Sequence, residues 1–359
     1  MGLAPYGRDK LAGELADLIQ RTPDGLFRVN LTWFSYHREG GWLSRQFLER
    51  YGPPRDPESA ITERHQDLAF AVQDLLEETA LHVARTLRRR TGLPNLCLAG
   101  GVALNSVMNS RLLREAGFER IFIQPAASDA GNALGAALWV WHQRLGRPRG
   151  QPMTHAFHGA DWSERNQAEA LANQGLQVRT VADPAEGAAR LLADSRIVGW
   201  FQGRAEVGPR ALGARSILAD PRRAETKDIV NDRVKRREGF RPFAPSVLDE
   251  HGPDFFDGYA SNPFMLLVQP VRPDRRAQIP AVTHVDGTAR LQSVTAAENP
   301  LYHRLISRFA AHTGVPVVLN TSFNLRGEPI VHRPGEAVAD FLRSDMDALF
   351  LGNLLATKD

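Results

Sequence analysis

The sequence has little that suits a membrane or an oxidising compartment. Its single cysteine, Cys97, excludes an internal disulfide and makes the cytoplasm the expected location. The longest apolar run, residues 133–141 with only Gly135 interrupting it, is too short to span a bilayer. No charged segment followed by an apolar stretch marks a secretory signal. The 359 residues are 43% hydrophobic and 24% charged, and we therefore expect a globular protein of ordinary composition without a membrane partner.

Lysine is also scarce. Only four of the 44 basic residues are lysines, and the formal net charge is +3. Acidic and basic residues are interleaved along the chain, whereas nucleic-acid-binding proteins usually concentrate basic charge on one face or tail. The charge pattern therefore predicts no nucleic-acid partner.

Several catalytic signatures are missing. The chain has no G-x-x-x-x-G-K-[ST] loop, no nucleophile elbow and no cysteine cluster. None of its eleven histidines forms an i,i+4 pair, and the closest two are His155 and His158. A helical two-histidine metal site of the H-E-x-x-H kind is therefore excluded.

The length predicts two domains, because single cores rarely grow beyond about 250–300 residues. Strand–loop–helix units in the first half predict parallel strands with helical crossovers, and the second half repeats the α/β theme. A segment rich in Pro and Gly, 145–160, is typical of a linker. The predicted helices cover 65–90, 105–116, 130–144, 225–236 and 299–312, with another after Pro334; the predicted strands cover 95–99, 121–123, 197–201, 264–268, 315–320 and 348–352, the last closing the sheet.

Two loops of the first half follow predicted strands. GGVALN (100–105) offers glycines that let backbone N–H groups approach a phosphate, although glycines at such turns also serve packing. PAASDAG (125–131) carries Asp129, which suits either an N-cap or a carboxylate ligand to a metal or Mg-nucleotide. Because ligands in α/β folds gather at the carboxyl ends of strands, both loops are candidate binding elements.

The second half is rich in cationic loops. The segment 203–222, GRAEVGPRALGARSILADPR, interleaves glycines with Arg204, Glu206, Arg210 and Arg215. Guanidinium groups presented from a tight loop suit recognition of phosphate or carboxylate, and the alternative is a solvated charged loop. Three further loops add polar and charged groups: Lys235, Arg237 and Arg241 in 234–247; His284, Asp286 and Arg290 in 283–290; Thr321, Ser322 and Asn324 in 320–324. Together they predict an anion-binding site.

An ordered series of motifs runs from residue 1 to about Val331: MGLAPYG, GGVALN, PAASDAGNALGAAL, VGWFQGRAEVGPRALGARSILADPR, VKRREGFRPFAPSV, AVTHVDGTAR and LNTSFNLRGEPIV. In these motifs the chain resembles the O-carbamoyltransferase family of nodulation and antibiotic-biosynthesis enzymes. The resemblance implies that residues 1–150 are the C-terminal portion of an actin-like (ASKHA-type) ATPase-fold domain, that 151–185 are a linker and entry segment, and that 186–359 are a YrdC-like domain.

The resemblance also implies an activity. The YrdC-like domain would make carbamoyl-adenylate from carbamoyl phosphate and ATP, and the actin-like domain would pass the carbamoyl group to a hydroxyl of a sugar or natural product. The K-x-R and S-x-N pairs of YrdC-like sites match Lys235 with Arg237 and Ser322 with Asn324. The implied catalytic residues are Lys235, Arg237, Arg210 and Arg290; the implied nucleotide-binding residues are Gly100, Gly101, Asn105, Arg215, Ser322 and Asn324; Asp129 is the implied metal ligand. The implied cofactors are ATP with Mg²⁺ and an iron-type metal.

One departure from the family pattern concerns the implied metal site. The family's H-x-x-x-H histidine pair precedes MGLAPYG, and this chain has no such pair, so we expect the metal site to be impaired and the transfer half to be incomplete. A complementing N-terminal subunit or a homodimer is one expected remedy. The alternatives are a chain competent only for carbamoyl-adenylate formation and a non-catalytic nucleotide-binding remnant.

Overall fold

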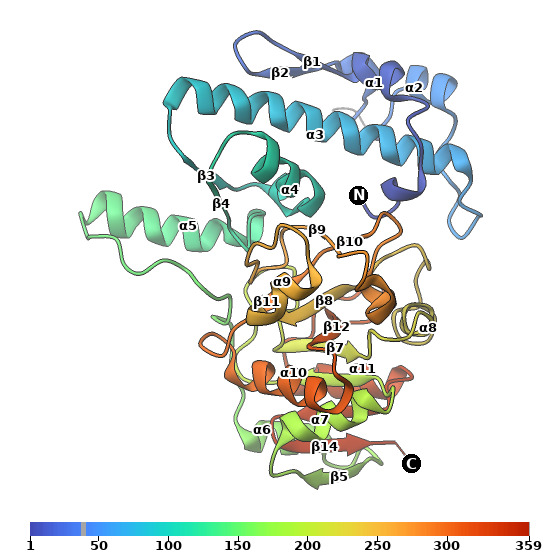
Figure 1. Ribbon diagram of the computed structural model, residues 1–359, viewed down its shortest axis with the longest axis vertical. Helices are drawn as coiled ribbons and strands as arrows, with labels where there is room; N and C mark the ends of the chain where they lie inside the picture. The colour runs from blue at the N-terminus through green and yellow to red at the C-terminus, as the bar shows by residue number, and fades with distance from the viewer. Residues whose placement is uncertain (37–40, 359) are drawn as a thin grey trace. The chain divides into compact units, whose positions relative to one another are not determined.

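The computed structural model describes residues 1–36 and 41–358 and contains two compact units (Figure 1). Unit 1 comprises Met1–Cys97 and Val107–Phe122, and unit 2 comprises Leu98–Ser106 and Ile123–Asp359. The domain limits predicted at residues 150 and 185 stay a prediction. Within the described part of the chain, no helix combines the length and apolarity needed to cross a membrane.

Unit 1 is organised by one long helix, α3 (Glu63–Thr91), which confirms the helix predicted over 65–90. The helix begins after Thr62, whose backbone N–H donates to Nδ1 of His65 at 3.0 Å, and ends at Gly92 with φ of 68°. The MGLAPYG segment packs against α3, because a Cβ added to Gly7 would collide with the carbonyl oxygen of Gln66. This glycine therefore permits a close approach between a loop and a helix backbone.

The remaining elements of unit 1 are short. A small core gathers Leu15, Leu18, Trp33, Phe47 and Tyr51, and Leu68 and Leu75 of α3 pack against it. The elements are α1 (Ala12–Leu15), α2 (Arg45–Tyr51), α4 (Ser106–Glu115), the antiparallel pair β1 (Ile19–Arg21) and β2 (Phe27–Val29), and the two-stranded sheet of β3 (Asn95–Leu98) and β4 (Arg120–Ile123).

Unit 2 is built on an eight-stranded mixed sheet, and the predicted α/β class is thereby confirmed. The strand order is β11-β8-β12-β7-β6-β13-β14-β5. The pairs β6–β13 and β8–β11 are parallel and the other pairs are antiparallel. The strands are β5 (Gln177–Thr180), β6 (Val198–Phe201), β7 (Arg215–Ala219), β8 (Ala244–Leu248), β11 (Gln292–Val294), β12 (Val317–Ser322), β13 (Ala348–Leu351) and β14 (Leu354–Thr357), with a separate pair β9 (Gln269–Pro270) and β10 (Thr288–Ala289).

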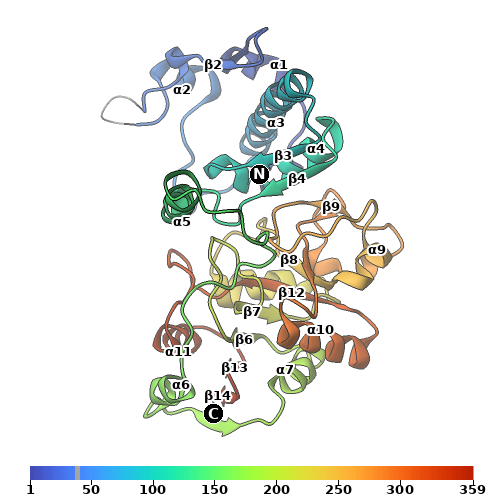
Figure 2. The same cartoon turned by 90° about the vertical axis from the view of Figure 1, so that its left-hand side faces the viewer.

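Helices cover both faces of this sheet. The pair α7 (Pro184–Ala193) and α10 (Pro300–Thr313) lies on one face, and α6 (Glu164–Leu171) with α11 (Pro334–Arg343) lies on the other (Figure 2). Central strands β6, β7, β8 and β13 are buried along their whole length, which is why they are almost uniformly apolar. The other helices of unit 2 are α5 (Asn132–Trp139), α8 (Glu225–Ile229) and α9 (Gly252–Phe255).

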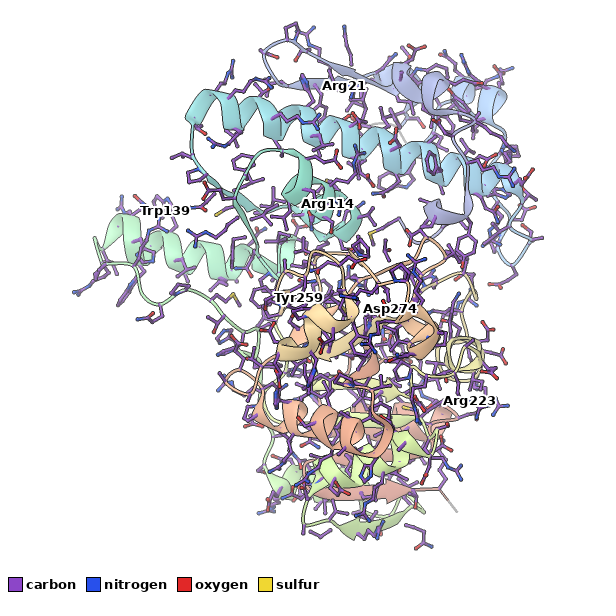
Figure 3. The ribbon with its side chains drawn as sticks, viewed as in Figure 1. Arg21, Arg114, Trp139, Arg223, Tyr259 and Asp274 are labelled. Carbon is purple, nitrogen blue, oxygen red and sulfur yellow. The ribbon has the colours of Figure 1, made fainter. Side chains whose placement is uncertain are left out.

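Helix α5 differs from the others because its apolar residues are not buried. Trp139, labelled in Figure 3, is 57% exposed. Leu138 and Trp141 are 46% and 49% exposed. The helix predicted over 130–144 is present as α5 with a tighter turn before it and a π-helical turn after it.

One predicted strand is absent, and another is present but lies elsewhere in the sheet than predicted. Residues 264–268 are buried but irregular, because the Asn262 side chain takes the place of a strand partner: Nδ2 donates to the carbonyl oxygen of Leu267 at 3.1 Å, and Oδ1 accepts from the N–H of Leu266 at 3.0 Å. The strand predicted over 348–352 is β13, yet it does not close the sheet. It is interior, because β14 and then β5 extend the sheet beyond it.

Candidate functional site

The candidate site of unit 2 is centred on Lys235. This lysine ends a π-helical turn, Val230–Lys235, that follows α8, and it is only 4% exposed. Its Nζ donates to the carbonyl oxygens of Ser322 at 2.7 Å and Asn324 at 2.9 Å, and to Oδ1 of Asn324 at 2.6 Å. The K-x-R and S-x-N pairs, 87 to 89 positions apart in sequence, therefore meet in space.

The acceptors that surround Lys235 are neutral oxygen atoms. They hold the ammonium group without cancelling its charge, so the group can still attract an anion. Burial, and then the charge of Arg237, lower the pKa of Lys235 to about 7, while the Asp340 carboxyl acts in the opposite direction. The cationic form of Lys235 is therefore sensitive to a nearby negative charge.

A pocket of about 230 Å³ opens beside Lys235. Its wall combines four cationic side chains with hydroxyl and amide groups and a single carboxylate. The lining residues are Lys235, Arg237, Glu238, Arg241, Ser322, Asn324, Leu325, Arg326 and Gly327. Such a lining favours a ligand with several negative charges.

The side chain of Arg237 is oriented by a residue that the sequence analysis did not single out. Nε of Arg237 donates to Oδ1 of the buried Asn231 at 2.8 Å, and Nδ2 of Asn231 donates to the carbonyl oxygen of Arg241 at 3.1 Å. The guanidinium lies 4.9 Å from the ring centroid of Phe243. Between the two site residues, Arg236 has a left-handed φ of 45°, which turns the chain after the π-helical segment. Burial lowers the pKa of Arg237 to about 10, with Arg241 adding to the effect.

Two further arginines extend the cationic region. Nε of Arg210 and Nε of Arg290 are buried and have no hydrogen-bond partner. Burial, followed by the charges of Arg210 and Arg237, holds the pKa of Arg290 well below its usual range. Burial likewise lowers the pKa of Arg210. Buried guanidinium atoms without acceptors are costly unless a ligand supplies the acceptor, so this arrangement suits an anion.

Nε of Arg215 is buried without a hydrogen-bond partner, as in Arg210 and Arg290, but its Nη atoms are held by backbone carbonyl oxygens. Arg215 is fully buried, and its Nη atoms donate to the carbonyl oxygens of Gln202 at 2.9 Å and Gly203 at 3.0 Å. The guanidinium stacks 3.6 Å from the ring centroid of Phe201. These contacts tie the start of the arginine-rich loop to the sheet. They favour a structural role for Arg215, which the sequence analysis predicted as a nucleotide-binding residue.

The arginine-rich loop is also held by Glu206. Its Oε1 accepts from the backbone N–H groups of Leu212 at 2.7 Å, Ala214 at 2.8 Å and Arg215 at 3.2 Å. One carboxylate thus fixes the conformation of the loop that carries Arg210.

A buried amide network supports the same loop, and sequence reasoning missed it. Nδ2 of Asn320 donates to the carbonyl oxygen of Ala211 at 3.1 Å, to Oγ of Ser246 at 3.0 Å and to Oε1 of Gln292 at 2.9 Å. Nε2 of Gln292 donates to the carbonyl oxygen of Leu212 at 2.8 Å. The only sequence signal for this network was the presence of polar residues in otherwise apolar strands, since buried polar groups are usually hydrogen-bonded.

The predicted loops of the first half meet the arginine-rich loop inside unit 2. The N–H of Gly100, with φ of 97°, donates to the carbonyl oxygen of Ala127 at 2.7 Å. Nη2 of Arg210 donates to the carbonyl oxygen of Leu104 at 3.3 Å. A Cβ on Gly208 would lie 2.5 Å from the carbonyl oxygen of Pro125. GGVALN, PAASDAG and the arginine-rich loop are therefore neighbours. Gly100 and Gly101 are exposed, and neither they nor Asn105 line the pocket beside Lys235.

Asp129 does not act as the N-cap considered in the sequence analysis. It is exposed and begins a short turn, Asp129–Gly131, whereas α5 begins later, at Asn132. Across residues 1–36 and 41–358, no group of three or more His, Cys, Asp or Glu side chains could hold a metal ion. Asp129 with its described neighbours therefore does not fit a metal centre, and we derive no chemical step through a metal.

Comparison with known proteins identifies the family. Residues 1–138 match the family described as "Carbamoyltransferase N-terminus", and residues 189–358 match "Carbamoyltransferase C-terminus". The chain is 44% identical to the nodulation protein NolO of Bradyrhizobium diazoefficiens, over all of this chain and 65% of that protein. It is 37% identical to a 3'-hydroxymethylcephem-O-carbamoyltransferase of Amycolatopsis lactamdurans, over 75% of this chain and 50% of that protein.

Similarity to solved structures is much weaker. The crystal structure of HypF of T. kodakarensis aligns with 51% of this chain and 23% of its own at a TM-score of 0.33 and 18% identity, which supports no argument about the site. The chain matches a Synechocystis protein and NolO along its whole extent and spans 63% and 65% of their lengths. From the two matched regions and these relatives, we conclude that the chain belongs to the carbamoyltransferase family.

Proposed function

We propose that this chain is an O-carbamoyltransferase polypeptide that activates carbamoyl phosphate with ATP and passes the carbamoyl group to a hydroxyl of a sugar or natural-product acceptor. The observation that supports it most is the cationic pocket around Lys235, whose ammonium group is held by neutral oxygens. Arg210 and Arg290 each have a buried Nε without an acceptor, and the charge of Arg290 interacts with those of Arg210 and Arg237. Family membership supplies the carbamoyl donor and the hydroxyl acceptor.

The proposed activation step needs several anions in one place. Carbamoyl phosphate reacts with water to release inorganic phosphate and carbamate, and a carbamate oxygen then attacks the α-phosphorus of ATP. The bond between the α-phosphorus and the bridging oxygen breaks, pyrophosphate leaves, and carbamoyl-adenylate remains. Fixed cationic donors stabilise the charge that develops on the transferring phosphate, and one shared pocket orients the two reactants.

Six of the predicted residues have distinct parts in this scheme. Lys235 and Arg237 line the pocket and would bind the nucleotide phosphates. Ser322 and Asn324 hold Lys235 and share a hydrogen bond of 2.7 Å with each other. Arg210 and Arg290 would bind the phosphate of the carbamoyl donor. The reactive mixed anhydride would then reach the acceptor hydroxyl, whose oxygen attacks the carbamoyl carbon and displaces AMP.

The decisive experiment measures pyrophosphate release from ATP by the purified chain, with and without carbamoyl phosphate. We expect release that depends on carbamoyl phosphate and that falls at least about tenfold in Lys235→Ala and in Arg237→Ala, because each loses a charge-assisted contact. Lys10→Ala and Arg165→Ala are matched controls, since both are exposed side chains that form ion pairs outside the pocket. Absence of release in the wild type, or equal rates in all five proteins, would contradict the proposal.

A second candidate keeps only the first half of the chemistry. Among the described residues no metal-binding cluster accompanies Asp129, which favours a chain that forms carbamoyl-adenylate without transferring it. Supplying the chain with hydroxylated acceptors and following carbamoyl ester formation separates the two candidates. Ester formed without any added protein would eliminate the second.

A further inference from the structure

Behind the pocket lies a charged cluster that none of the predicted site residues includes. Arg343 at the end of α11 makes a two-pronged contact with Glu328, with Nη1 at 2.8 Å from Oε1 and Nη2 at 3.1 Å from Oε2. Its Nη2 also donates to Oδ1 of Asp340, one helical turn earlier, at 2.6 Å. We call Glu328, Asp340 and Arg343 the triad.

The triad is connected to Lys235 through the loop 324–328. The carbonyl oxygen of Glu328 accepts from Nδ2 of Asn324 at 2.6 Å, and Oδ1 of the same asparagine accepts from Nζ of Lys235 at 2.6 Å. Both ends of one amide group are thereby fixed, one by the triad's loop and the other by the site lysine. The loop also forms part of the pocket wall through Asn324, Leu325, Arg326 and Gly327.

Asp340 is unusual for a residue that only anchors a helix end. Its side chain is 4% exposed, and Oδ2 is buried without a hydrogen-bond partner. Burying a carboxyl group with an unmatched oxygen is costly, so an apolar residue would anchor the helix better. Burial, and then the neighbouring Glu328, raise the pKa of Asp340 to about 6, so that at neutral pH it is ionised.

The charges around Asp340 come from three elements. Arg343 lies on its own helix, Glu328 lies on the loop, and Lys235 lies on the π-helical turn. Within the described chain, Asp340 is the carboxyl whose charge favours protonation of Lys235, whereas the charge of Arg237 opposes it. The direct contacts of the Lys235 ammonium are neutral, so the Asp340 charge acts on it through space.

We propose that the triad is a positioning device for the nucleotide pocket, in which Arg343, bound to Asp340, holds Glu328 and thereby the loop that presents Asn324 to Lys235. None of the three has to touch the ligand. The proposal rests on the proposed function for its catalytic consequence, but the charge coupling between Asp340 and Lys235 can be measured without any activity.

The first test is a titration of Lys235 itself. The chain has only four lysines, so ¹³Cε-lysine labelling gives a spectrum with four signals, and Lys235→Arg identifies the one required. Asp340→Asn keeps an acceptor for Arg343 and removes the charge. We expect the titration midpoint of Lys235 to fall by about half a pH unit or more, because an opposite charge favours the charged form. The matched control is Asp345→Asn, an exposed aspartate just beyond α11.

An unchanged Lys235 midpoint in folded Asp340→Asn overturns the link from the triad to Lys235, whatever the activity of the wild type. Absent pyrophosphate release in the wild type would instead defeat the proposed function alone. Where release is measured, the wild type and Asp340→Asn should have similar kcat/KM near pH 5.5, since Asp340 is then protonated in the wild type. Above pH 6 the curve of Asp340→Asn should decline earlier, and identical curves would count against the proposal.

The second test concerns the loop. Arg343 is 53% exposed, so Arg343→Gln leaves no core cavity, and Glu328→Gln removes the same ion pair from its other side. We expect each variant to raise KM for ATP about threefold to tenfold with kcat changed less than twofold, since a loosened wall weakens ground-state binding. Glu169→Gln breaks an exposed ion pair with Arg165 of 2.7 Å and is the control. KM values within twofold of wild type in both variants would overturn the proposal that the triad positions the loop. This test does not depend on whether Asp340→Asn folds.

Discussion

Nζ of Lys235 and Oδ1 of Asn324 lie 2.6 Å apart although 89 positions separate them in the chain. The contact joins the turn after α8 to the loop after β12, and both belong to unit 2. The lysine side chain is buried at this contact, and its charge is opposed by Arg237 and supported by Asp340. The ionisation of one side chain is therefore a measurable property of the whole site.

The first prediction concerns pH. Because the pKa of Lys235 is lowered to about 7, the cation is present below that pH and is lost as the pH rises through it. We expect kcat/KM for ATP in pyrophosphate release to decline above about pH 7. Lys235→Arg keeps its charge at all these pH values, so its smaller activity should not decline in the same range. Parallel alkaline declines in the two proteins would show that another group is responsible.

The second prediction separates two arginines of one loop. Arg215→Gln leaves the carbonyl oxygens of Gln202 and Gly203 without their buried donor, which should cost about 2–4 kcal/mol of unfolding free energy. Arg210→Gln removes a guanidinium that donates to the carbonyl oxygen of Leu104 at 3.3 Å, and it should mainly raise KM for carbamoyl phosphate. Urea unfolding and steady-state kinetics on both variants check this. Equal stability losses would contradict the distinction.

The third prediction concerns the buried amide network. Asn320→Ala removes three hydrogen bonds and leaves the carbonyl oxygen of Ala211 without this donor, whereas Oγ of Ser246 keeps its bond to Oε1 of Gln292, so we expect a loss of about 2–3 kcal/mol of unfolding free energy. The control, Asn353→Ala, alters an exposed turn residue before β14 and should change stability by less than about 0.5 kcal/mol. Similar losses of unfolding free energy in both variants would mean that the network contributes no more to stability than an exposed turn residue.

The fourth prediction concerns packing in unit 1. Gly7→Ala places a methyl group against the backbone of α3 at Gln66, so the MGLAPYG segment should detach. Faster cleavage of this segment by a protease at low concentration, with a lower Tm, is the expected result. Gly13→Ala is the matched control, because its Cβ meets nothing within 4 Å and alanine suits the interior of α1 better, by up to about 1 kcal/mol. If the protease cleaved Gly7→Ala no faster than wild type, the packing argument would be refuted.

Regular elements with strong local signals could be predicted from the sequence. The helix over 65–90 has amphipathic spacing and a glycine at its end, and α3 confirms it. The buried strands over 197–201 and 315–320 are confirmed as β6 and β12. The apolar run 264–268 looked the same and is not a strand, because Asn262, close in sequence but oriented by the tertiary fold, satisfies its backbone. Periodicity cannot distinguish these two outcomes.

The candidate site, too, could be predicted only in part from the sequence. Sequence by itself determined the class of fold, the family and the residue types of the site, because cationic groups, glycines and short polar side chains in ordered motifs are local features. Tertiary structure alone decided which arginines line the pocket, as Arg237 does, and which, like Arg215, bind backbone carbonyl groups. The physical reason is that burial and the distance between charges depend on contacts between segments far apart in the chain, and these quantities set the pKa of a side chain and the cost of leaving it without a partner.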